Sequence, residues 1–514
     1  MSKTIIIIGA GLAGLSAALQ AAENGCNVKL VSSLPSERAQ SVMAEGGINA
    51  ALNTKDENDS PEEHFTDTIK AACGLADPNA VWGMTQAAPE LVHWLLKLGV
   101  KFNMSGYDDV DLRNFGGQKK KRTAFAQSDT GKQIMTAMID AVRRKEASGM
   151  VERFSHHSFL TLRLCGNICC GCVIRDEYSQ ETVELPGDAV IVATGGMHGL
   201  FGNTTGSLSN TGEVTAELFR LGVPLVNGEM IQYHPTTVEC GGKRMLISEA
   251  ARGEGGRLFA LRNNQPWYFM EEKYPELGNL MPRDITAREI WKVSHESEVF
   301  LDMTEISKEV ISNKLSGLAD DCMTYLHKDI RKEPVPVLPG IHYFMGGILV
   351  DEQHRTSIQN LYAAGECCAQ YHGANRLGGN SLLGALYGGR VAAKSACEQA
   401  DGVVLSCATQ IDIPPASQIS EIKQLNKVMQ ETMGVVRNEN TLLNGIQTVQ
   451  ALTGNLPLLG MAVLKSALAR KESRGAHWRE DYPKSNDDDY LKTTVARFDG
   501  KQIQISFVPV PERR

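Results

Sequence analysis

The stretch Ile5-Ile-Ile-Ile-Gly-Ala-Gly-Leu-Ala-Gly14 decides the fold class of this chain. Residues 4–8 form a continuous apolar run that is typical of a buried strand, and the glycines open a helical pattern that continues through Ala22. Val28-Lys-Leu-Val31 then supplies a second short strand. A glycine turn between a strand and a helix is specific for a βαβ unit that binds dinucleotide phosphates at the N-terminus of its helix.

Two more strand-and-glycine segments lie far downstream, at residues 188–196 and 360–366. At the end of the second strand, where NAD-binding units carry an acidic residue for the ribose, this chain has Ser32 and Ser33. The missing acid argues against a standard NAD site. Segments spread so widely indicate a large FAD-type domain that is interrupted by an insertion.

The order of strand and helix patterns predicts an α/β fold. We expect a Rossmann-like FAD-binding domain in two parts, residues 1–221 and 341–400, interrupted by an α+β capping domain at residues 222–340. The strand–glycine–helix rhythm lapses in the insertion, which is rich in Glu, Arg and Pro.

A C-terminal helical domain is expected over residues 415–514. Apolar residues recur with helical spacing at 418–436 and 441–472, and residues 501–508 alternate like a terminal strand.

Composition excludes several classes of protein. The 514 residues carry a formal net charge of −8, so general attraction to nucleic acid or anionic lipid is not expected. The chain has no apolar run long enough to span a membrane, and it begins with a strand rather than a signal segment. These features predict a cytoplasmic protein without direct membrane insertion, and they leave open a peripheral position through a partner subunit.

The 12 cysteines are irregularly spaced, which does not suit a disulfide framework. Cys165, Cys169, Cys170 and Cys172 are typical of a hairpin with its turn near residues 166–167. We therefore expect packed thiols and no metal site.

Three separated segments place cationic or hydrogen-bonding side chains beside glycines or a proline: Gln232-Tyr-His-Pro-Thr236, Ser248-Glu-Ala-Ala-Arg-Gly-Glu-Gly-Gly256 and His372-Gly-Ala-Asn-Arg-Leu-Gly-Gly-Asn-Ser381. Such segments suit backbone that comes close to a small anion. Beside a nucleotide-binding turn, they predict redox chemistry on a dicarboxylate. Reducing or forming a double bond between carboxylates needs a hydride carrier, a proton donor or acceptor, and cations that fix both carboxylates.

The sequence resembles the flavoprotein subunit of fumarate reductase and succinate dehydrogenase and, more distantly, L-aspartate oxidase. The likeness runs through nearly the whole chain. Besides the Gly9 turn and the three anion-binding segments, the matching motifs are Ala44-Glu-Gly-Gly47, Phe115-Gly-Gly117, Asp129-Thr-Gly131, Ala193-Thr-Gly-Gly196, Pro282-Arg-Asp284, His342-Tyr-Phe-Met-Gly-Gly347 and Glu472-Ser-Arg-Gly-Ala-His477.

The resemblance implies a catalytic acid and a proton relay. Arg283, in the Pro-Arg-Asp motif, matches the residue that delivers the proton to the substrate. Glu249 and Arg252 match the relay that reprotonates it. A guanidinium has a pKa above ~12 and is a poor acid in water, so it can serve only if it is reprotonated at once.

The resemblance also implies how the substrate is held. His342 and Arg376 match the pair that binds one carboxylate, while His234 and Ser248 match the pair that binds the other. Many family members have threonine where this chain has Ser248, and either hydroxyl donates the same hydrogen bond.

The flavin contacts follow from the same resemblance. Gly9, Gly11 and Gly14 let the first helix approach the pyrophosphate, and the helix that opens near residues 380–382 directs its N-terminus at the flavin. Glu366 suits a ribityl or ribose hydroxyl. The expected cofactor residues are Gly9, Gly11, Leu12, Ala13, Gly14, Ser32, Ser41, Ala44, Gly46, Gly47, Thr194, Gly195, Glu213, Glu366, Arg376, Ser381 and Leu382.

One position departs from the family pattern. Members of the membrane complexes attach FAD covalently to a histidine five positions before the acidic or amide residue of Ala-Glu/Gln-Gly-Gly, and this chain has Gln40 there. Because an amide cannot form that bond, we expect non-covalent FAD. The histidyl link raises the flavin potential in the family, so its loss favours fumarate reduction over succinate oxidation.

L-aspartate oxidase is the first alternative, because it shares the carboxylate-binding residues and also lacks the histidyl link. In that enzyme an acidic residue receives the substrate amino group at the position where this chain has Phe115. A third hypothesis is an electron-transfer flavoprotein subunit that acts on another unsaturated dicarboxylate. The sequence shows no cluster-ligand spacing of its own, so electrons are expected from an iron–sulfur subunit or a soluble donor.

Several of these residues could have a purely structural role instead of a role in binding or catalysis. His234 taken alone is typical of a structural histidine, Arg252 and Glu254 suit an exposed ion pair, and Arg283 suits a helix cap. The basic run Lys119-Lys-Lys-Arg122 is expected to be a solvated loop, or to guide a dicarboxylate, rather than to bind a polyanion.

Overall fold

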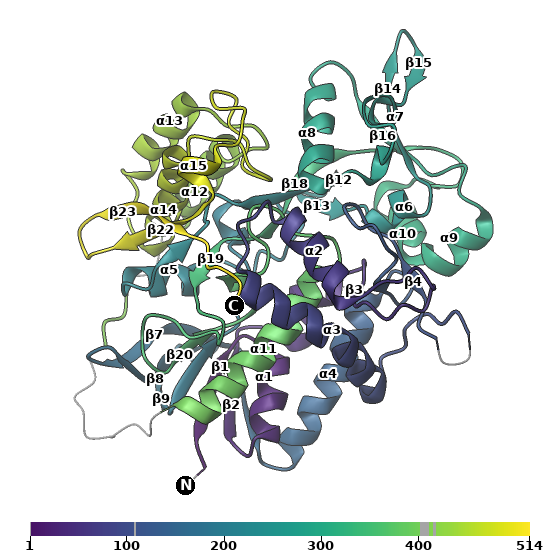
Figure 1. Ribbon diagram of the computed structural model, residues 1–514. Helices are drawn as coiled ribbons and strands as arrows, with labels where there is room; N and C mark the ends of the chain where they lie inside the picture. The colour runs from purple at the N-terminus through teal and green to yellow at the C-terminus, as the bar shows by residue number, and fades with distance from the viewer. Residues whose placement is uncertain (1, 107–108, 401–410, 415–417) are drawn as a thin grey trace.

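The computed structural model describes residues 2–106, 109–400, 411–414 and 418–514. Its central element is a parallel sheet with the strand order β20 (Leu361–Ala363), β10 (Ala189–Val192), β1 (Thr4–Ile8), β2 (Asn27–Ser32) and β6 (Val151–Ser155). Helix α1 (Leu12–Glu23) connects β1 to β2. The three strand-and-glycine segments therefore lie side by side, and the predicted α/β fold is confirmed (Figure 1).

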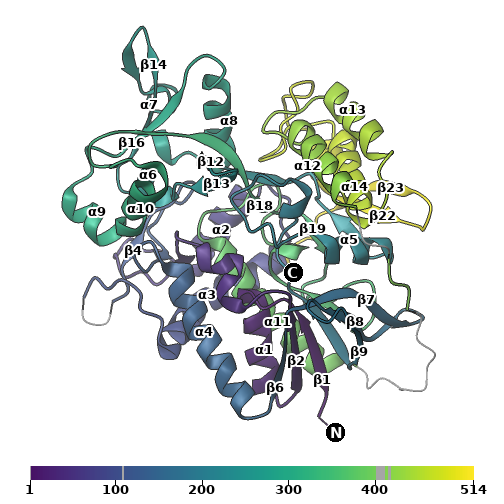
Figure 2. The ribbon, with the colours of Figure 1, turned by 180° about the vertical axis from the view of Figure 1, so that it is seen from behind.

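The four isoleucines of β1 are buried because both faces of the sheet are covered. Ile5 and Ile7 pack against a helical layer of α1, α3 (Pro78–Leu98), α4 (Thr130–Ala147) and α11 (Asn380–Gln399). Ile6 and Ile8 pack against the antiparallel sheet of β7 (His157–Cys165), β8 (Ile168–Asp176) and β9 (Thr182–Pro186). Figure 2 shows the helices on one side and β7–β9 on the other. Successive side chains of a strand point to opposite faces, so a doubly covered strand needs an unbroken apolar run.

The part of the chain expected to form a cap lies beyond the carboxyl ends of the parallel strands (Figures 1 and 2). One of its sheets contains β13 (Lys243–Leu246), β12 (Ile231–Cys240) and β18 (Leu338–Phe344), and the other contains β15 (Gln265–Trp267), β14 (Arg257–Arg262), β16 (Val299–Asp302) and β17 (Val335–Pro336). Its helices are α6 (Glu249–Gly253), α7 (Phe269–Lys273), α8 (Arg283–Val293), α9 (Lys308–Lys314), α10 (Ser316–Asp321) and the π-helix Cys322–Leu326.

The C-terminal part combines helices with two strands. Helices α12 (Ile419–Thr432), α13 (Glu439–Val449) and α14 (Asn455–Ala469) gather on the side opposite the cap (Figure 1), and the short α15 (Asp487–Tyr490) follows them. The expected helical stretch 441–472 is thus two helices, with Gly454 immediately before the second. No helix in the described part of the chain is long and apolar enough to cross a bilayer.

The terminal strand joins a sheet that the sequence did not predict. Strand β23 (Ile503–Pro509) pairs with β22 (Lys492–Phe498), which continues through β11 (Leu225–Val226) to β19 (Gly347–Leu349) and β21 (Cys368–Ala369). Strand β11 lies inside the expected 222–340 insertion, and β18 runs across residue 340. The expected start of the last domain, residue 415, lies outside the described residues, so the domain limits stay predictions.

One small sheet and two helices remain to be described. Strands β3 (Ile48–Asn49), β5 (Thr123–Ala124) and β4 (Leu112–Arg113) form a small sheet, and α2 (Pro61–Ala71) and α5 (Glu213–Arg220) complete the helices. Cys169, Cys170 and Cys172 are buried free thiols in β8, as expected. Cys165, at the end of β7, is disulfide-bonded, so the expectation of a packed thiol is wrong for this residue.

The basic run at residues 119–122 is not wholly solvated, because Arg122 is fully buried. Its Nε and Nη2 donate to Asp59 at 3.1 and 2.8 Å, and Nη2 forms an ion pair with Asp67 at 3.0 Å. By contrast, half of the Lys121 side chain is exposed, and it lies 3.7 Å from Glu57. Arg122 therefore ties α2 to the loop that follows β4, and the expectation of a solvated loop is wrong for this residue.

We expect Arg122→Met to lower the free energy of unfolding by about 3–5 kcal/mol, because it leaves two buried carboxylates without their cation. Urea unfolding followed by circular dichroism measures the loss. Lys121→Ala is the matched control and should move the midpoint little, since exposed pairs contribute at most about 1 kcal/mol. Equal shifts for the two variants would contradict this role of Arg122.

Candidate active site

A cavity of about 1240 Å³ opens at the carboxyl ends of the central strands. The glycine turn after β1 and the residues that follow β2, β10 and β20 line it, and it continues beneath the cap to β12, β13 and α8. Ligands of parallel α/β sheets bind at this edge. Typical small-molecule pockets measure about 300–1,000 Å³, so this cavity has room for a dinucleotide and a second small molecule.

The glycine turn leaves an open space at the N-terminus of α1. A Cβ on Gly14 would lie 1.9 Å from the Gly9 oxygen, and a Cβ on Gly9 would lie 2.3 Å from the Ala193 oxygen, so the backbone packing itself requires both glycines. A Cβ on Gly11 would meet nothing closer than Ser41 Oγ at 3.6 Å. The space at Gly11, beside the N-terminus of α1, fits a pyrophosphate.

Nearly all of the residues expected to contact FAD line this cavity. Gly14 does not, because it packs against Gly9. Gln40 also lines the cavity. The expected residues that line it are Gly9, Gly11, Leu12, Ala13, Ser32, Ser41, Ala44, Gly46, Gly47, Thr194, Gly195, Glu213, Glu366, Arg376, Ser381 and Leu382.

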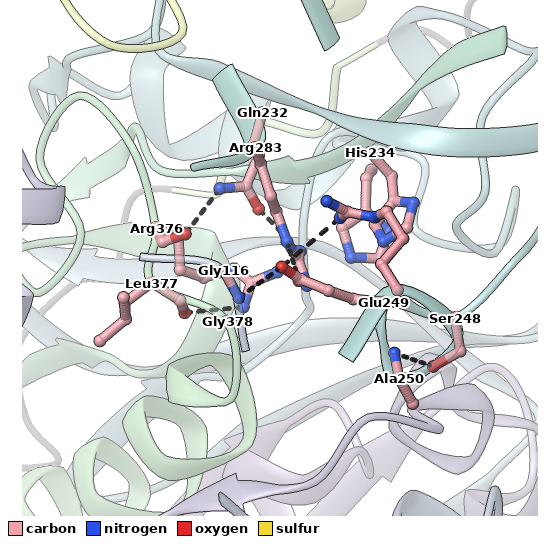
Figure 3. Close-up of polar contacts among 12 residues, drawn as sticks. Gly116, Gln232, His234, Ser248, Glu249, Ala250, Arg283, Arg376, Leu377 and Gly378 are labelled. Carbon is pink, nitrogen blue, oxygen red and sulfur yellow. Dashed lines mark hydrogen bonds and ion pairs between the residues drawn. The ribbon is translucent and has the colours of Figure 1, made fainter. Parts of the chain in front are cut away.

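A buried carboxylate organises the end of the cavity beneath the cap (Figure 3). Glu249, in the first turn of α6, accepts hydrogen bonds from Arg283 Nε at 2.7 Å and from the backbone N–H of Gly116 at 2.9 Å. Arg283 Nη2 lies 2.6 Å from the same carboxylate, and Arg252 Nη2 lies 3.5 Å from its other oxygen. The structure therefore brings together the three residues expected to form the acid and its relay.

The cations around Glu249 determine its charge. Burial alone would raise the pKa of this carboxyl, but Arg283, Arg252 and their hydrogen bonds outweigh burial and hold the pKa below its usual value. Burial lowers the pKa of Arg252, although Glu249 opposes that shift. Glu249 is therefore ionised at neutral pH and in contact with both guanidinium groups.

The four residues expected to bind carboxylates line the same end of the cavity. The His234 and His342 rings lie 5.1 Å apart, and Arg376 lies over the Tyr343 ring at 4.5 Å. Ser248 is the N-cap of α6, and its hydroxyl accepts from Ala250 N–H at 3.4 Å.

Both histidines are neutral imidazoles at neutral pH. Burial and then the nearby Arg283 cation lower the pKa of His234 and of His342 well below the usual value. Thr205 Oγ1 lies 2.8 Å from His342 Nδ1, and a bond from this hydroxyl leaves Nε2–H of His342 free to donate. His234 Nε2 is buried without a hydrogen-bond partner among the described residues. Its Nδ1 lies 3.0 Å from the Thr236 oxygen, to which it donates in one tautomer, and 3.3 Å from the Thr236 nitrogen, from which it accepts in the other. Only the second tautomer carries an Nε2–H that can donate to an anion.

The structure also tests the purely structural roles considered for Arg252 and Arg283, an exposed ion pair and a helix cap. Arg252 is buried rather than exposed, and it pairs with Glu249, whereas Glu254 pairs with Lys314 at 3.1 Å. Arg283 is the first residue of α8, but its side chain bonds to α6 and β12 rather than capping its own helix.

Sequence reasoning missed several residues of the site. Gln232 accepts from Arg283 Nη1 at 3.1 Å and donates to Asn375 Oδ1 at 2.9 Å and to the Arg376 oxygen at 2.8 Å. It therefore ties Arg283 to the segment that carries Arg376 (Figure 3). Glu45 lines the cavity as well. Gln232 and Glu45 both lie in motifs that the sequence analysis had already identified, so their place in those motifs could have marked them as site residues.

Fold and cavity together define the class of this protein: a flavin-dependent oxidoreductase whose dinucleotide cleft leads into a buried cationic pocket. Two family models match the chain, an FAD binding domain over residues 4–382 and the C-terminal region of the fumarate reductase flavoprotein over residues 452–513. The chain belongs to the fumarate reductase and succinate dehydrogenase flavoprotein family, and it is an FAD-dependent oxidoreductase that acts on CH–CH bonds.

Individual relatives extend over the full chain. The succinate dehydrogenase flavoprotein subunit of Bacillus subtilis is 37% identical, with coverage of 100% of this chain and 98% of that protein. The 8-methylmenaquinol:fumarate reductase flavoprotein subunit of Wolinella succinogenes is 33% identical, with coverage of 100% and 92%. A solved FrdA of Escherichia coli quinol fumarate reductase superposes with a TM-score of 0.88 at 27% identity, covering 99% of this chain and 97% of that one. The resemblance seen in the sequence is confirmed.

Glu45 makes the pocket sensitive to pH. Burial and the nearby Asp321 raise the pKa of Glu45 to about 8, so it is neutral below that pH and becomes an anion above it. We expect the affinity for malonate, an unreactive dicarboxylate, to fall as pH rises through about 8, because the new charge repels the ligand. Calorimetry on Glu45→Gln should show that the loss near pH 8 has disappeared, so that affinity falls only as Arg376, whose pKa burial lowers to about 9, loses its charge.

Glu90→Gln, an exposed change on α3, is the control and should keep the wild-type pH profile. An unchanged profile in Glu45→Gln would show that another group titrates.

Proposed function

We propose that this chain is a fumarate reductase that binds FAD non-covalently. The charge balance of the pocket carries the proposal: Arg252, Arg283 and Arg376 are buried there, and Glu249 is the carboxylate that contacts two of them. No ion pair to Arg376 occurs among the described residues. Two positive charges are left uncompensated in a dry pocket, which is costly without a counter-charge, and a small dicarboxylate supplies two negative charges.

The free N–H groups of Arg283 suit it to donate a proton. A guanidinium has five N–H groups, and three of them bond to Glu249 and Gln232. The remaining N–H groups are available to a ligand. Bound FAD, once reduced by the electron donor, would supply the hydride for one carbon of the double bond, and Arg283 donates the proton to the other carbon.

Reprotonation of Arg283 runs through Glu249. After it has given up its proton, Arg283 is neutral and still in contact with a carboxylate oxygen. A proton passes from Arg252 to Glu249 and from there to Arg283, and Arg252 then regains a proton from solvent. The 3.5 Å Arg252–Glu249 contact is the longer link of this relay. Arg252 Nη1 is anchored by the Asn279 oxygen at 2.6 Å, which keeps the relay in place.

The remaining polar groups fix the carboxylates. His342 and Arg376 bind one carboxylate, and His234 and Ser248 bind the other. Burial and then Arg283 lower the pKa of Arg376 to about 9. A bound carboxylate favours the protonated form and so strengthens its own binding.

The direction of the reaction follows from Gln40, which lines the cavity at the position of the family histidine. Without a histidyl link the flavin potential stays lower, which favours reduction of fumarate. L-aspartate oxidase is less well supported, because Phe115 is buried against Gly46 and gives a substrate ammonium no counter-charge. An iron–sulfur partner subunit or a soluble donor would supply the electrons.

We expect Arg283→Ala to retain FAD and to lose fumarate turnover by at least about 100-fold, in line with the loss of a general acid. Anaerobic reoxidation of the reduced flavin by fumarate, followed by absorbance, measures the effect. Arg331→Ala removes a half-exposed arginine and serves as the control. Near-normal turnover in Arg283→Ala would remove it as the acid, and failure of fumarate to reoxidise the wild-type flavin would overturn the proposed activity.

We expect the denatured polypeptide to have the mass of the unmodified chain, with all of the FAD released, because the Gln40 amide cannot hold the cofactor covalently. Mass spectrometry of the acid-denatured holoprotein checks this. A polypeptide mass increased by one flavin would contradict it.

A further inference from the structure

The hairpin of β12 and β13 forms a wall of the cavity between solvent and the arginine pocket. His234 lies in β12 and Ser248 follows β13, so the end of the hairpin away from its turn carries both residues of one proposed carboxylate site. At the turn, Gly241 and Lys243 are exposed and also line the cavity. A residue that lines a cavity and also meets solvent lies at an opening. The turn of this hairpin is therefore one rim of the cavity mouth beneath the cap.

The π-helix Cys322–Leu326 lies beside this opening. Its Tyr325 is exposed and lines the cavity, and Cys240 Sγ donates to the Tyr325 oxygen at 3.7 Å, which joins the hairpin to the helix. FAD is expected to fill the end of the cavity at the glycine turn after β1. A substrate that binds the loaded protein therefore reaches the arginine pocket from the cap end, past the β12–β13 hairpin.

Arg244, in the same hairpin, lies on the face of the sheet that carries His234. Gly340 of β18 is the register partner of His234, and residues directly opposite each other in a sheet share a face. A Cβ on Gly340 would lie 2.6 Å from Arg244 Cδ, so this glycine leaves room for the arginine side chain. Arg244 Nη1 donates to Thr237 Oγ1 at 3.1 Å. The guanidinium is thus held along the wall that leads from the opening to His234.

Lys243 and Arg244 have no acidic partner in the part of the chain that the structure describes. Glu239 stands opposite Arg244 in the strand register, but its carboxylate accepts from Asn203 Nδ2 at 3.1 Å instead of pairing with the arginine. Lys243 is exposed and Arg244 is half-buried, and both line the cavity. Two uncompensated positive charges therefore lie on the route to the pocket, where an incoming anion meets them first.

We propose that Lys243 and Arg244 form a cationic entrance that draws a dicarboxylate into the arginine pocket. The chain carries a formal net charge of −8, so a dianion is attracted only where a local cluster of cations outweighs that charge. The basic run at residues 119–122 does not line the cavity and cannot take this part. The inference rests on the proposed dicarboxylate substrate, and it assigns the approach of that substrate to residues outside the pocket that binds it.

Stopped-flow binding of malonate to the oxidised holoprotein, followed by flavin absorbance, measures the association rate constant without turnover. Arg244→Gln and Lys243→Gln should each lower this constant by about 3- to 10-fold at low ionic strength, because each removes one attracting charge. The difference from wild type should vanish at about 1 M salt, where the Debye length is about 3 Å. Arg244→Lys keeps the charge and should keep most of the wild-type rate.

Arg262→Gln is the matched control, since Arg262 is an exposed arginine of the cap that does not line the cavity. It should keep the wild-type rate at every salt concentration. Wild-type rates in both Arg244→Gln and Lys243→Gln at low salt would overturn the entrance. An equal loss at low and high salt would also overturn it, because a distorted hairpin rather than a missing charge would then be the cause.

The same measurement separates this inference from the proposed function. If wild-type protein binds malonate but fumarate does not reoxidise its flavin, the proposed activity fails while the salt dependence of the variants still decides the entrance. If malonate does not bind to the wild-type protein at all, the dicarboxylate pocket and the entrance are both overturned.

Discussion

The buried contact between Glu249 and its two arginines is the interaction on which the site depends. Glu249 joins α6 to the first residue of α8, and Gln232 of β12 completes the bonds of Arg283. Removal of Glu249 would leave both arginines, and removal of both arginines would leave Glu249, as buried charges without a partner, which is far more costly than loss of a surface pair. These contacts therefore hold α6, α8 and β12 together through the same charges that we propose bind the ligand and move the proton.

The parallel sheet supplies the rigid part on which this arrangement rests. Because helices cover one face and β7–β9 cover the other, the strand ends are free only at the cavity edge. The three glycines of the turn have different roles. A Cβ at Gly9 or Gly14 would clash with the protein backbone, whereas the space beside Gly11 is open to a ligand. The cofactor half of the cavity is thus set by sterics, whereas the substrate half is set by charge.

Much of the fold and the site could be predicted from local sequence signals. The opening βαβ unit, the downstream strands and the cavity-lining residues named from the sequence follow from motifs that carry their own glycines and charges. Arg122 was misjudged because its position in a basic run resembles a solvated loop, while its partners Asp59 and Asp67 are distant in sequence. Gln232 was missed as a site residue for the same reason, since its bonds reach α8 and the segment before α11.

The sequence by itself determined the fold class, the nucleotide-binding turn and the types of residue needed for a dicarboxylate, because steric and chemical requirements at short range can be recognised within one segment. Only the tertiary structure decided that Arg283 points at Glu249, that two arginines share this one carboxylate, and that His156 and Tyr178 pack together beside the cavity. It also placed β23 in a sheet with β11, which lies far away in the chain. Such contacts depend on long-range packing, and no local pattern in the sequence specifies which distant segments come together.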